Sequence, residues 1–467
     1  MKKLKILMVT AEMAPFAKVG GLADVLGSLP MALKKNNCDV RIVMPLYGLI
    51  DKEKYNIQKK FANIAVPFAD KMVKVNVWET SFKSVKVYFI EYSKYFGKKD
   101  VYIHDDNAER YLFFSQASLY VLPVLKFQPD IIHCHDYHTS MIPLLLKSSN
   151  YEYFKNIKTV LTIHNLQYQG KTSQKVLELI GLDRDVGEKT LNFMEKGIVY
   201  ANQVNTVSPT YSKEIFGKLF GAGLEKLLLK NKNKVSGILN GIDMDFFNPA
   251  KDKLIAKKYS SDNLTGKKIN KTKLQELVGL EMSSKPLVGL ISRFVEQKGL
   301  GLITEEIINL DCQFVFLGTG DKKYEDLLKK LAKQYPQKVS VQNKFDIKLA
   351  QLIYAGSDIF LMPSRFEPCG LGQMIAMRYG TVPVVRAVGG LVDTVFECEA
   401  RHVRCQMNGF SFETMTIKGL KDALKRAIAL YSNSDEWKKI QRTGMTTDFS
   451  WNHSAQRYIE LYKKALK

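Results

Sequence analysis

Short apolar runs, each followed by a polar or glycine-bearing turn and a helical pattern, recur along this chain of 467 residues. Apolar runs this short, bounded by turn residues, are typical of buried parallel strands. The first half has its predicted strands at residues 4–10, 40–44, 85–90, 131–135, 159–163, 204–207 and 235–239. The second half has them at residues 287–292, 314–317, 339–341, 359–362 and 382–385. Strands that alternate with helices predict an α/β fold with two doubly wound parallel sheets.

Helical spacing fills the segments between the strands. One face of a helix predicted for residues 22–35 carries Leu22, Val25, Leu26, Leu29 and Leu33. Further helices are predicted at residues 108–125, 324–334 and 373–379. The lysine-rich run 251–273 lacks this periodicity, so we expect a surface connection that leads into the first helix of the second half. The length suits two domains better than one, and we expect them at residues 1–245 and 246–452, with a hinge near residues 240–249.

The clearest candidate site follows the predicted strand at residues 359–362. Its turn carries Glu367, Gly370 and Gly372 before a helical pattern begins. A glycine-bearing turn at a helix N-terminus offers backbone N–H groups to an anion. A carboxylate at the carboxyl end of a strand is better explained by hydroxyl groups than by phosphate. A phosphate together with a polyol predicts a nucleotide sugar as the ligand.

A second glycine turn lies between the first strand and its helix, in the sequence KVGGLADV. The backbone of Gly20 and Gly21 is suited to hold a phosphate or sugar oxygen, with Lys18 adding charge and Asp24 accepting from a hydroxyl. The alternative is a tight strand-to-helix turn that needs glycine for its shape. A glycine pair by itself does not separate these two interpretations.

Two cations follow the predicted strand at residues 287–292, in the sequence SRFVEQKG. Arg293 and Lys298 lie at the carboxyl end of this strand, where two positive charges can neutralise a diphosphate leaving group without a metal. The alternative is a pair of surface side chains whose partner is solvent or Glu296.

A cluster of histidines surrounds the predicted strand at residues 131–135. His133 and His135 share a face of that strand, and Asp136 and His138 follow it, so a metal site is one interpretation. The spacing shows no fourth ligand. A loop at the end of a strand uses the same residue types to bind sugar hydroxyls, and this second interpretation is favoured.

Two other motifs have weaker support. His164 follows a buried strand, so its imidazole is expected to reach a ligand, although a hydrogen-bonded core histidine is the alternative. Asp243 and Asp245 match the DxD pattern by which some sugar transferases bind a metal. Such a short pattern arises often by chance, and a capping or hinge role is favoured.

The net charge of +22 and the pI of about 9.4 raise the question of nucleic acid. The basic residues are scattered, and lysine outnumbers the arginine that groove-reading proteins favour, so no nucleic-acid partner is expected. The paired lysines are predicted to lie on solvated helix faces: Lys34-Lys35, Lys59-Lys60, Lys257-Lys258, Lys267-Lys268 and Lys463-Lys464.

The chain shows no pattern of a membrane or secreted protein. No apolar run is long enough to cross a bilayer, and the first residues lead into a strand rather than a cleavage site. The six cysteines lack the spacing of a zinc site or a disulfide framework, which favours packing roles in a reducing cytoplasm. They are Cys38, Cys134, Cys312, Cys369, Cys398 and Cys405.

Over essentially its whole length the chain resembles the bacterial glycogen and starch synthases. The motifs that carry the resemblance are, in order, KVGGLADV, HCHDYHTS, TIHNLQYQG, LNGID, SRFVEQKG, LGTGD, PSRFEPCGLGQ, VGGLVDTV and a closing FSW. The family implies a GT-B fold, in which two Rossmann-like domains face each other across a cleft and the final helix, here 453–467, returns to the first domain. It also implies transfer of glucose from ADP-glucose to an α-1,4-glucan such as glycogen, with retention. Because Arg293 and Lys298 can stabilise the departing diphosphate, we expect that no metal and no cofactor is needed.

The resemblance also implies roles for individual residues. The catalytic group comprises Glu367, which faces the glucose hydroxyls, Arg293 and Lys298, which neutralise the diphosphate, and His164, which reaches the sugar near the reacting carbon. Donor binding is implied for Lys18, Gly20, Gly21, Phe345, Gly370, Leu371 and Gly372. Other residues of the cleft, near donor or acceptor, are Asp24, Asp136, His138 and Asn240.

Two positions differ from many members of that family. Phe345 lies where a tyrosine commonly stacks on adenine, and Gly372 lies where a threonine is common. A phenyl ring still stacks, and a glycine still donates its backbone N–H, so activity is expected to survive. The preference between ADP-glucose and UDP-glucose is left open by these differences.

Three other functions are compatible with parts of the sequence. Another GT-B enzyme, such as a sucrose or trehalose-phosphate synthase, would not depend on a long glucan acceptor. A silent glucan-binding protein would retain oligosaccharide without consuming a nucleotide sugar, but the full set of ionic donor residues makes this interpretation less favoured. A nucleic-acid-binding protein would show a steep salt dependence on DNA or RNA.

Overall fold

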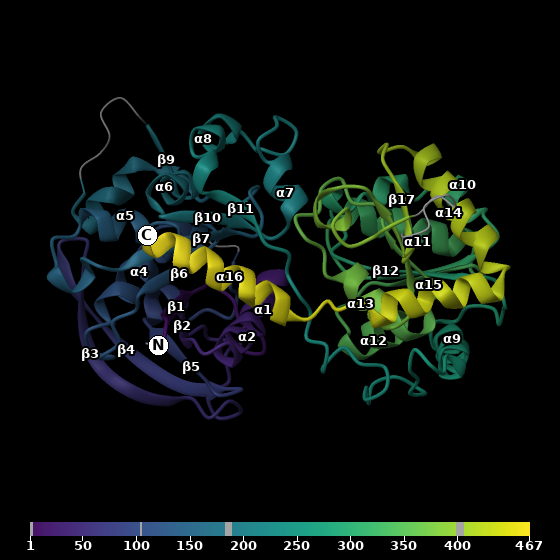
Figure 1. Ribbon diagram of the computed structural model, residues 1–467, viewed down its shortest axis with the longest axis horizontal. Helices are drawn as coiled ribbons and strands as arrows, with labels where there is room; N and C mark the ends of the chain where they lie inside the picture. The colour runs from purple at the N-terminus through teal and green to yellow at the C-terminus, as the bar shows by residue number, and fades with distance from the viewer. Residues whose placement is uncertain (1–2, 103–104, 183–188, 398–405) are drawn as a thin grey trace. The chain divides into compact units, whose positions relative to one another are not determined.

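The computed structural model describes residues 3–102, 105–182, 189–397 and 406–467, and within them the chain forms two compact units. Unit 1 comprises Met1–Gly241 with Trp451–Lys467, and unit 2 comprises Ile242–Ser450. These boundaries lie within a few residues of those expected from the sequence. Each unit contains its own sheet with a core of parallel strands flanked by helices, which makes the fold two α/β domains with Rossmann-like cores (Figure 1).

The sheet of unit 1 has nine strands in the order β11-β10-β7-β6-β1-β2-β5-β4-β3. Strands β1, β2, β5, β6, β7, β10 and β11 are parallel to one another, as the alternation of strands and helices predicts. The strands are β1 (Lys5–Val9), β2 (Asp39–Pro45), β3 (Gln58–Phe68), β4 (Lys71–Phe82), β5 (Val85–Glu91), β6 (Ile131–His135), β7 (Lys158–Ile163), β10 (Gln203–Thr206) and β11 (Val235–Gly237). A separate small hairpin pairs β8 (Lys171–Ser173) with β9 (Thr190–Asn192).

The long antiparallel strands β3 and β4 were not predicted from the sequence. They pair with each other, and β4 pairs antiparallel with β5 at the edge of the sheet. The first half of β3 is mostly exposed, so its sequence contains no apolar run there that would predict a strand. In β4, the buried Val75 and Val77 alternate with less buried neighbours, which is the period of a half-buried strand. That alternation was the available signal.

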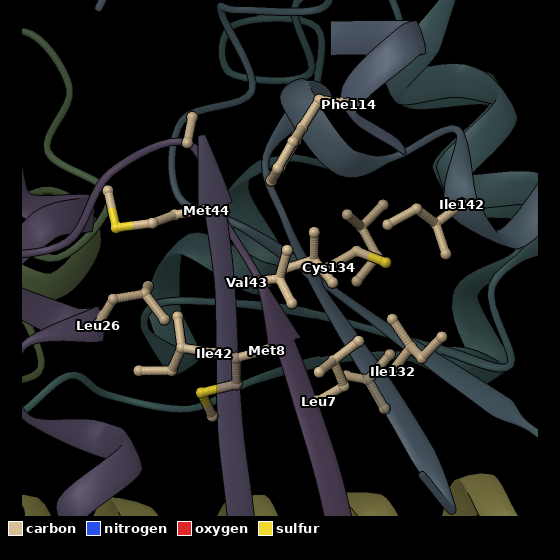
Figure 2. Close-up of a cluster of buried hydrophobic side chains, with 14 of the residues drawn as sticks. Leu7, Met8, Leu26, Ile42, Val43, Met44, Phe114, Ile132, Cys134 and Ile142 are labelled. Atoms are coloured by element: carbon tan, nitrogen blue, oxygen red, sulfur yellow. The ribbon is translucent and has the colours of Figure 1, made fainter. Parts of the chain in front are cut away.

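The core of unit 1 lies on both faces of the central strands. Because side chains of a strand alternate between the two faces, Met8 and Ile42 lie on one face while Leu7 and Val43 lie on the other, as Figure 2 shows. Leu26 covers the first face in the same view. Residues on both faces are completely buried, which is what a parallel sheet with helices on each side requires.

The helix predicted for residues 22–35 is two helices, α1 (Gly21–Leu26) and α2 (Leu29–Lys35). Pro30 lies in the first turn of α2, where its missing N–H costs nothing, whereas in one continuous helix it would clash with the preceding turn. The long helix predicted for residues 108–125 is α4 (Asn107–Tyr120), which ends before Pro123. The other helices of this part are α3 (Ser93–Phe96), α5 (Ile142–Ser148), α6 (Phe193–Tyr200), α7 (Pro209–Glu214) and α8 (Glu225–Lys230).

The last helix, α16 (Trp451–Leu466), belongs to unit 1 although unit 2 precedes it in the chain. Figure 1 shows it, in yellow, among the helices and strands of unit 1. Its buried Tyr458 and Tyr462 reach the sheet, where the Tyr462 hydroxyl lies 2.9 Å from Nδ1 of His133. A polar contact to a central strand therefore fixes this helix in place.

The sheet of unit 2 has six strands in the order β14-β13-β12-β15-β16-β17, all parallel. They are β12 (Leu287–Ile291), β13 (Gln313–Leu317), β14 (Val339–Gln342), β15 (Ile359–Met362), β16 (Val382–Arg386) and β17 (Phe410–Phe412). Five of the six match predicted strands, and only β17 was missed. Its three residues are too short to show a period.

The helices of unit 2 correct one expectation about charge. They are α9 (Thr265–Val278), α10 (Glu305–Ile308), α11 (Lys322–Gln334), α12 (Ile347–Gly356), α13 (Gly372–Arg378), α14 (Ile417–Tyr431) and α15 (Ser434–Thr446). Lys267 of α9 was predicted on a solvated face, yet it is buried and its Nζ donates to the carbonyls of Ala355 and Tyr379 and to Thr381. Lys59 and Lys60 lie on strand β3 and not on a helix. In the part of the chain that the structure describes, no helix combines the length and the apolar character needed to cross a membrane.

Candidate functional site

In each unit two of the candidate motifs follow the strands at which the strand order reverses. From β12 the chain proceeds to β13 and β14 on one side, and then crosses to β15 on the other side of β12. In unit 1 it proceeds from β1 to β2, and later crosses to β6 on the other side of β1. Open parallel sheets bind ligands at the carboxyl ends of the strands at such a switch point. The motifs SRFVEQKG and PSRFEPCGLGQ follow β12 and β15, and KVGGLADV and HDYH follow β1 and β6.

In unit 2 the structure brings together two residues from these neighbouring loops. Nζ of Lys298 lies 2.6 Å from Oε2 of Glu367, and Oγ of Ser364 donates to the same oxygen at 2.9 Å. The Glu367 carboxylate is buried, and the side chain of Lys298 is mostly buried. A buried carboxylate needs such partners, because an unpaired charge away from water is costly.

Backbone contacts hold the two loops of this pair in register. The N–H of Arg365 donates to the carbonyl of Gln297, and the Gln297 side chain donates to the carbonyl of Phe366. Gly299 adopts a left-handed backbone with φ of 70°, and a Cβ at this position would lie 1.8 Å from the carbonyl oxygen of Pro363. The glycine that ends SRFVEQKG is therefore required for the approach of the second loop.

Arg293 is exposed in the same loop as Lys298. The alternative interpretation made solvent or Glu296 the partner of these cations, and the structure gives Glu296 and Lys298 other partners. Glu296 pairs with Arg365 at 3.1 Å, and Lys298 pairs with Glu367. The two cations therefore differ in environment: the guanidinium of Arg293 is exposed, and the side chain of Lys298 is mostly buried.

The turn from Gly370 to Gly372 is fixed by a buried glutamine. Gly370 has φ of 74°, and the side-chain amide of Gln373 donates to the carbonyls of Cys369 and Gly370. Leu371 then precedes α13, which begins at Gly372. Gln373 was not singled out from the sequence, because its role depends on a turn whose shape the sequence does not show.

Packing against a neighbouring ring explains why a glycine occupies position 372. A Cβ at this position would lie 2.9 Å from a ring carbon of Phe360, which is completely buried in β15. The phenyl ring therefore takes the space that a threonine side chain would need. Phe345 lies between β14 and α12 and is 80% exposed, so its ring is accessible for stacking.

In unit 1, Asp136 has a constrained backbone and a buried carboxylate. It has φ of 55° in a buried position directly after β6, a strained backbone for a residue other than glycine. Its Oδ1 accepts from the backbone N–H of His164 at 2.7 Å and of Asn165 at 3.3 Å. Burial raises the pKa of the carboxyl to about 7, although these two hydrogen bonds oppose the shift.

The rings of His133, His135 and His164 contact one another in a row, and His133 and His135 share a face as predicted. Nε2 of His133 lies 2.6 Å from Thr162 Oγ1, and Nδ1 of His135 lies 3.0 Å from Nε2 of His164. Burial lowers the pKa of His133 and of His164 to about 3, and that of His135 well below its usual value. Among the described residues, no three His, Cys, Asp or Glu side chains are arranged to hold a metal ion.

The KVGGLADV loop differs from the expectation in one respect. Lys18 and Asp24 are close, with Nζ 2.6 Å from Oδ1. The N–H of Gly20, expected to hold a donor oxygen, donates instead to Oε2 of Glu12 at 2.9 Å. Glu12 was not singled out from the sequence, although it follows β1 at the ligand-binding edge of the sheet. Gly21 begins α1.

Two further predicted residues of unit 1 are buried with unpaired polar atoms. Within the described residues, Nδ1 of His138 and Oδ1 of Asn240 have no hydrogen-bond partner. Tyr102 stacks on the His138 ring with centroids 4.9 Å apart. Burial lowers the pKa of His138 to about 3, so this imidazole is neutral near pH 7.

A cavity of about 570 Å³ lies beside the same part of unit 1. Two tyrosines, Tyr137 and Tyr168, line it together with hydrogen-bonding side chains that include Asp105, Gln167 and Thr172. Tyr168 is half-exposed. Aromatic faces with amide, hydroxyl and carboxylate groups are suited to a polar ligand that carries many hydroxyls.

The remaining motifs have structural roles in the described residues. Oδ1 of Asp243 accepts from the N–H groups of Asp245 and Phe246, which is the capping role favoured over metal binding. Four cysteines are buried thiols, as expected for packing residues: Cys38, Cys134, Cys312 and Cys369. Cys398 and Cys405 lie outside the described residues.

Comparison with known protein families divides the chain as the structure does. Residues 5–230 match the model of the starch synthase catalytic domain. Residues 278–443 match the model of the glycosyl transferases of group 1. The first match lies within unit 1 and the second within unit 2.

Individual relatives match along both units. A glycogen synthase from Thermotoga petrophila is 45% identical over 483 residues, covering 99% of each chain. A glycogen synthase from Clostridium novyi is 43% identical over 478 residues, again covering 99% of each chain. The catalytic domain of starch synthase IV from Arabidopsis thaliana, solved bound to ADP and acarbose, shares 36% identity with a TM-score of 0.94 and covers 100% of each chain. The likeness therefore extends over the whole chain and not over one unit alone.

Proposed function

The chain belongs to the glycogen and starch synthase family of GT-B glycosyltransferases, and from this premise we propose that it transfers glucose from ADP-glucose to an α-1,4-glucan. Transfer goes to the non-reducing end of the glucan, retains the anomeric configuration and needs no metal ion. The observation that carries the proposal is the pairing of Lys298 with Glu367 at the switch point of the sheet of unit 2. In this proposal the ammonium of Lys298 binds phosphate and the neighbouring carboxylate of Glu367 accepts from sugar hydroxyls.

The donor binds through residues of unit 2. The exposed guanidinium of Arg293 and the ammonium of Lys298 neutralise the diphosphate, and the turn from Gly370 to Gly372 offers backbone N–H groups to it. Glu367 accepts from glucose hydroxyls, and the exposed ring of Phe345 stacks on the adenine. The ADP in the Arabidopsis relative supports an adenine nucleotide as the leaving group.

Residues of unit 1 act on the sugar and the acceptor. Lys18 and Gly21 meet the donor, His164 reaches the glucose near its reacting carbon, and Asp136 holds the backbone of His164 in place. The glucan binds along the cavity lined by Tyr137 and Tyr168, where aromatic faces suit sugar rings and the neighbouring polar side chains suit their hydroxyls. The remaining residues proposed for this part are Asp24, His138 and Asn240.

Retention follows from attack on the face that the leaving group occupies. The 4-hydroxyl oxygen of the glucan bonds to C1 of the glucose, and the bond from C1 to the phosphate oxygen breaks. The proton of that hydroxyl passes to the departing phosphate, so that ADP and a glucan longer by one glucose are formed. Arg293 and Lys298 stabilise the negative charge that develops on the diphosphate. The protein holds the acceptor hydroxyl and the leaving phosphate on the same side of C1 for this single step.

The test is incorporation of labelled glucose into glycogen from ADP-glucose and, separately, from UDP-glucose, each with and without EDTA. We expect strong transfer from ADP-glucose that EDTA does not change. Absence of transfer from both donors would refute the synthase function, and loss of transfer in EDTA would refute the metal-independent step. Fractionation of cells that express the chain tests its proposed cytoplasmic location.

A further inference from the structure

A buried carboxylate lies beneath the KVGG loop and binds its backbone. Glu12 is 3% exposed, and its Oε2 accepts from the N–H of Val19 at 2.7 Å and of Gly20 at 2.9 Å. The hydroxyl of Tyr102 donates to the other oxygen, Oε1. The Thr10 hydroxyl accepts from the N–H of Glu12 and donates to its carbonyl, which fixes the backbone of Glu12 as well. The Glu12 carboxylate therefore accepts hydrogen bonds from three residues, Val19, Gly20 and Tyr102.

The conformation of Gly20 shows that these bonds, and not the glycine itself, define the loop. Its backbone is extended, with φ of −142° and ψ of −167°, a conformation that any residue adopts. A Cβ at this position would meet no atom within 4 Å in the described chain. Neither strain nor packing therefore requires this shape, whereas two charge-assisted hydrogen bonds to Glu12 hold it.

The same carboxylate connects the loop to the turn after β6. Tyr102 donates to Glu12 and stacks on His138, with an angle of 23° between the rings. His138 is only two residues from Asp136, whose carboxylate binds the backbone of His164. A continuous set of contacts thus runs from the KVGG loop to the residues proposed to act on the sugar.

We propose that Glu12 is a positioning residue for glucosyl transfer, which fixes the KVGG loop against the Asp136–His138 turn so that Lys18 and Gly21 meet the donor. The inference rests on the proposed function, because it assigns Glu12 a role toward the same donor. Glu12 touches no reacting atom in this role and acts only through the loop and through Tyr102.

Three variants and one control test this role. E12A removes the acceptor of both loop N–H groups. E12Q keeps one side-chain oxygen to accept from both and can donate its amide to Tyr102, and Y102F removes the hydroxyl while keeping the ring stacked on His138. The control is Y55F, which removes a hydroxyl that donates to the carbonyl of Pro15 in the same segment.

The kinetic readout separates positioning from folding. For E12A we expect the KM for ADP-glucose to rise and kcat to fall, each about tenfold, with the KM for glycogen unchanged, since a hydrogen bond to a charged group contributes about this much. E12Q should recover to within about threefold of wild type, Y102F should fall between them, and Y55F should match wild type. A merely structural role would lower apparent kcat in proportion to the folded fraction and leave both KM values unchanged, which would overturn the inference.

A second measurement does not depend on activity. Hydrogen exchange of the Val19 and Gly20 amides should be slow in wild type and in E12Q, and fast in E12A. Equal exchange in E12A and wild type, or E12Q impaired as strongly as E12A, would overturn the inference. If E12A does not fold, the comparison of E12Q and Y102F with Y55F decides by the same criteria. Wild-type protein that transfers no glucose would refute the proposed function, whatever the exchange rates show.

Discussion

Nζ of Lys298 lies 2.6 Å from Oε2 of Glu367, and this contact joins the loops that follow two neighbouring strands, β12 and β15. The two residues are far apart in the sequence and belong to different motifs. Because the carboxylate is buried, each side chain depends on the other for its charged state to be tolerated. The pair therefore links the stability of unit 2 to its proposed donor chemistry.

Replacing Lys298 by Ala should affect turnover and stability separately. We expect kcat to fall on the order of 10²–10³, because a cation that stabilises the leaving diphosphate is lost, while the KM for glycogen stays unchanged. Unfolding should become easier by about 3–5 kcal/mol, because Glu367 remains buried without its cation. Steady-state kinetics and denaturant unfolding measure the two effects.

The double variant K298A/E367Q separates the two effects. It should regain much of the lost stability, because no uncompensated charge remains, yet it should not regain turnover. The control is R365A, which breaks the exposed pair with Glu296 and should change neither quantity appreciably. Unchanged turnover in K298A would contradict the role of Lys298 in leaving-group stabilisation.

Replacing Gly372 by Thr should destabilise unit 2. The new Cβ would lie 2.9 Å from the ring of the buried Phe360, so we expect a loss of about 1–3 kcal/mol in the free energy of unfolding. Combining it with F360L should cost less than the sum of the two single changes, because the smaller side chain makes room. As a control, G301A adds a Cβ where no atom lies within 4 Å and should change stability by less than about 0.5 kcal/mol. Equal stabilities of G372T and G301A would show that Phe360 does not restrict this position.

Replacing Phe345 by Ala should weaken donor binding without affecting the fold. The ring is 80% exposed, so its loss costs little packing, but the loss of stacking should raise the KM for ADP-glucose about threefold to tenfold. F345Y should keep the wild-type value, since it retains the aromatic face. I347A alters a neighbouring exposed side chain and is the matched control. A wild-type KM in F345A would remove Phe345 from the donor site.

Unit 1 should lose stability on acidification. Burial lowers the pKa of His133, His138 and His164 to about 3 and that of His135 well below its usual value, so between pH 6.5 and about 3 the unfolded chain binds more protons than the folded one. Stability therefore falls with pH in this window, by up to about 1.4 kcal/mol per pH unit for each histidine. Asp136 acts in the opposite direction, because its pKa is raised from 3.8 to about 7. Because four histidines lower the stability on acidification and only Asp136 raises it, the net effect is a loss of stability.

Denaturant unfolding at pH 7, 5.5 and 4 measures this dependence. We expect the midpoint to fall steadily toward pH 4. H453Q removes a histidine that is exposed on α16 and should leave the slope with pH unchanged. A stability that stays constant from pH 6.5 to 4 would contradict a neutral, buried row of histidines.

The sequence by itself determined most of what depends on local period. Apolar runs placed the parallel strands of both sheets except β17, and the turns after them made Arg293, Lys298 and Glu367 candidates, because strand patterning and glycine turns are properties of neighbouring residues. The exposed first half of β3 and the short β17 carry no such pattern, and they were missed for that reason. The alternation in β4 was present in the sequence and could have been used.

The tertiary structure alone decided which residues meet. Sequence patterns predicted separate roles for Lys298 and Glu367, and only the adjacency of β12 and β15 makes them partners. Lys267 was predicted to be solvated, but in the folded chain it is buried and donates to carbonyls of other elements. The backbone N–H of Gly20 was predicted to bind the sugar donor, but in the structure it donates to the carboxylate of Glu12. Ion pairs and hydrogen bonds form between groups that are close in space, whereas a sequence pattern shows only which residues are close along the chain.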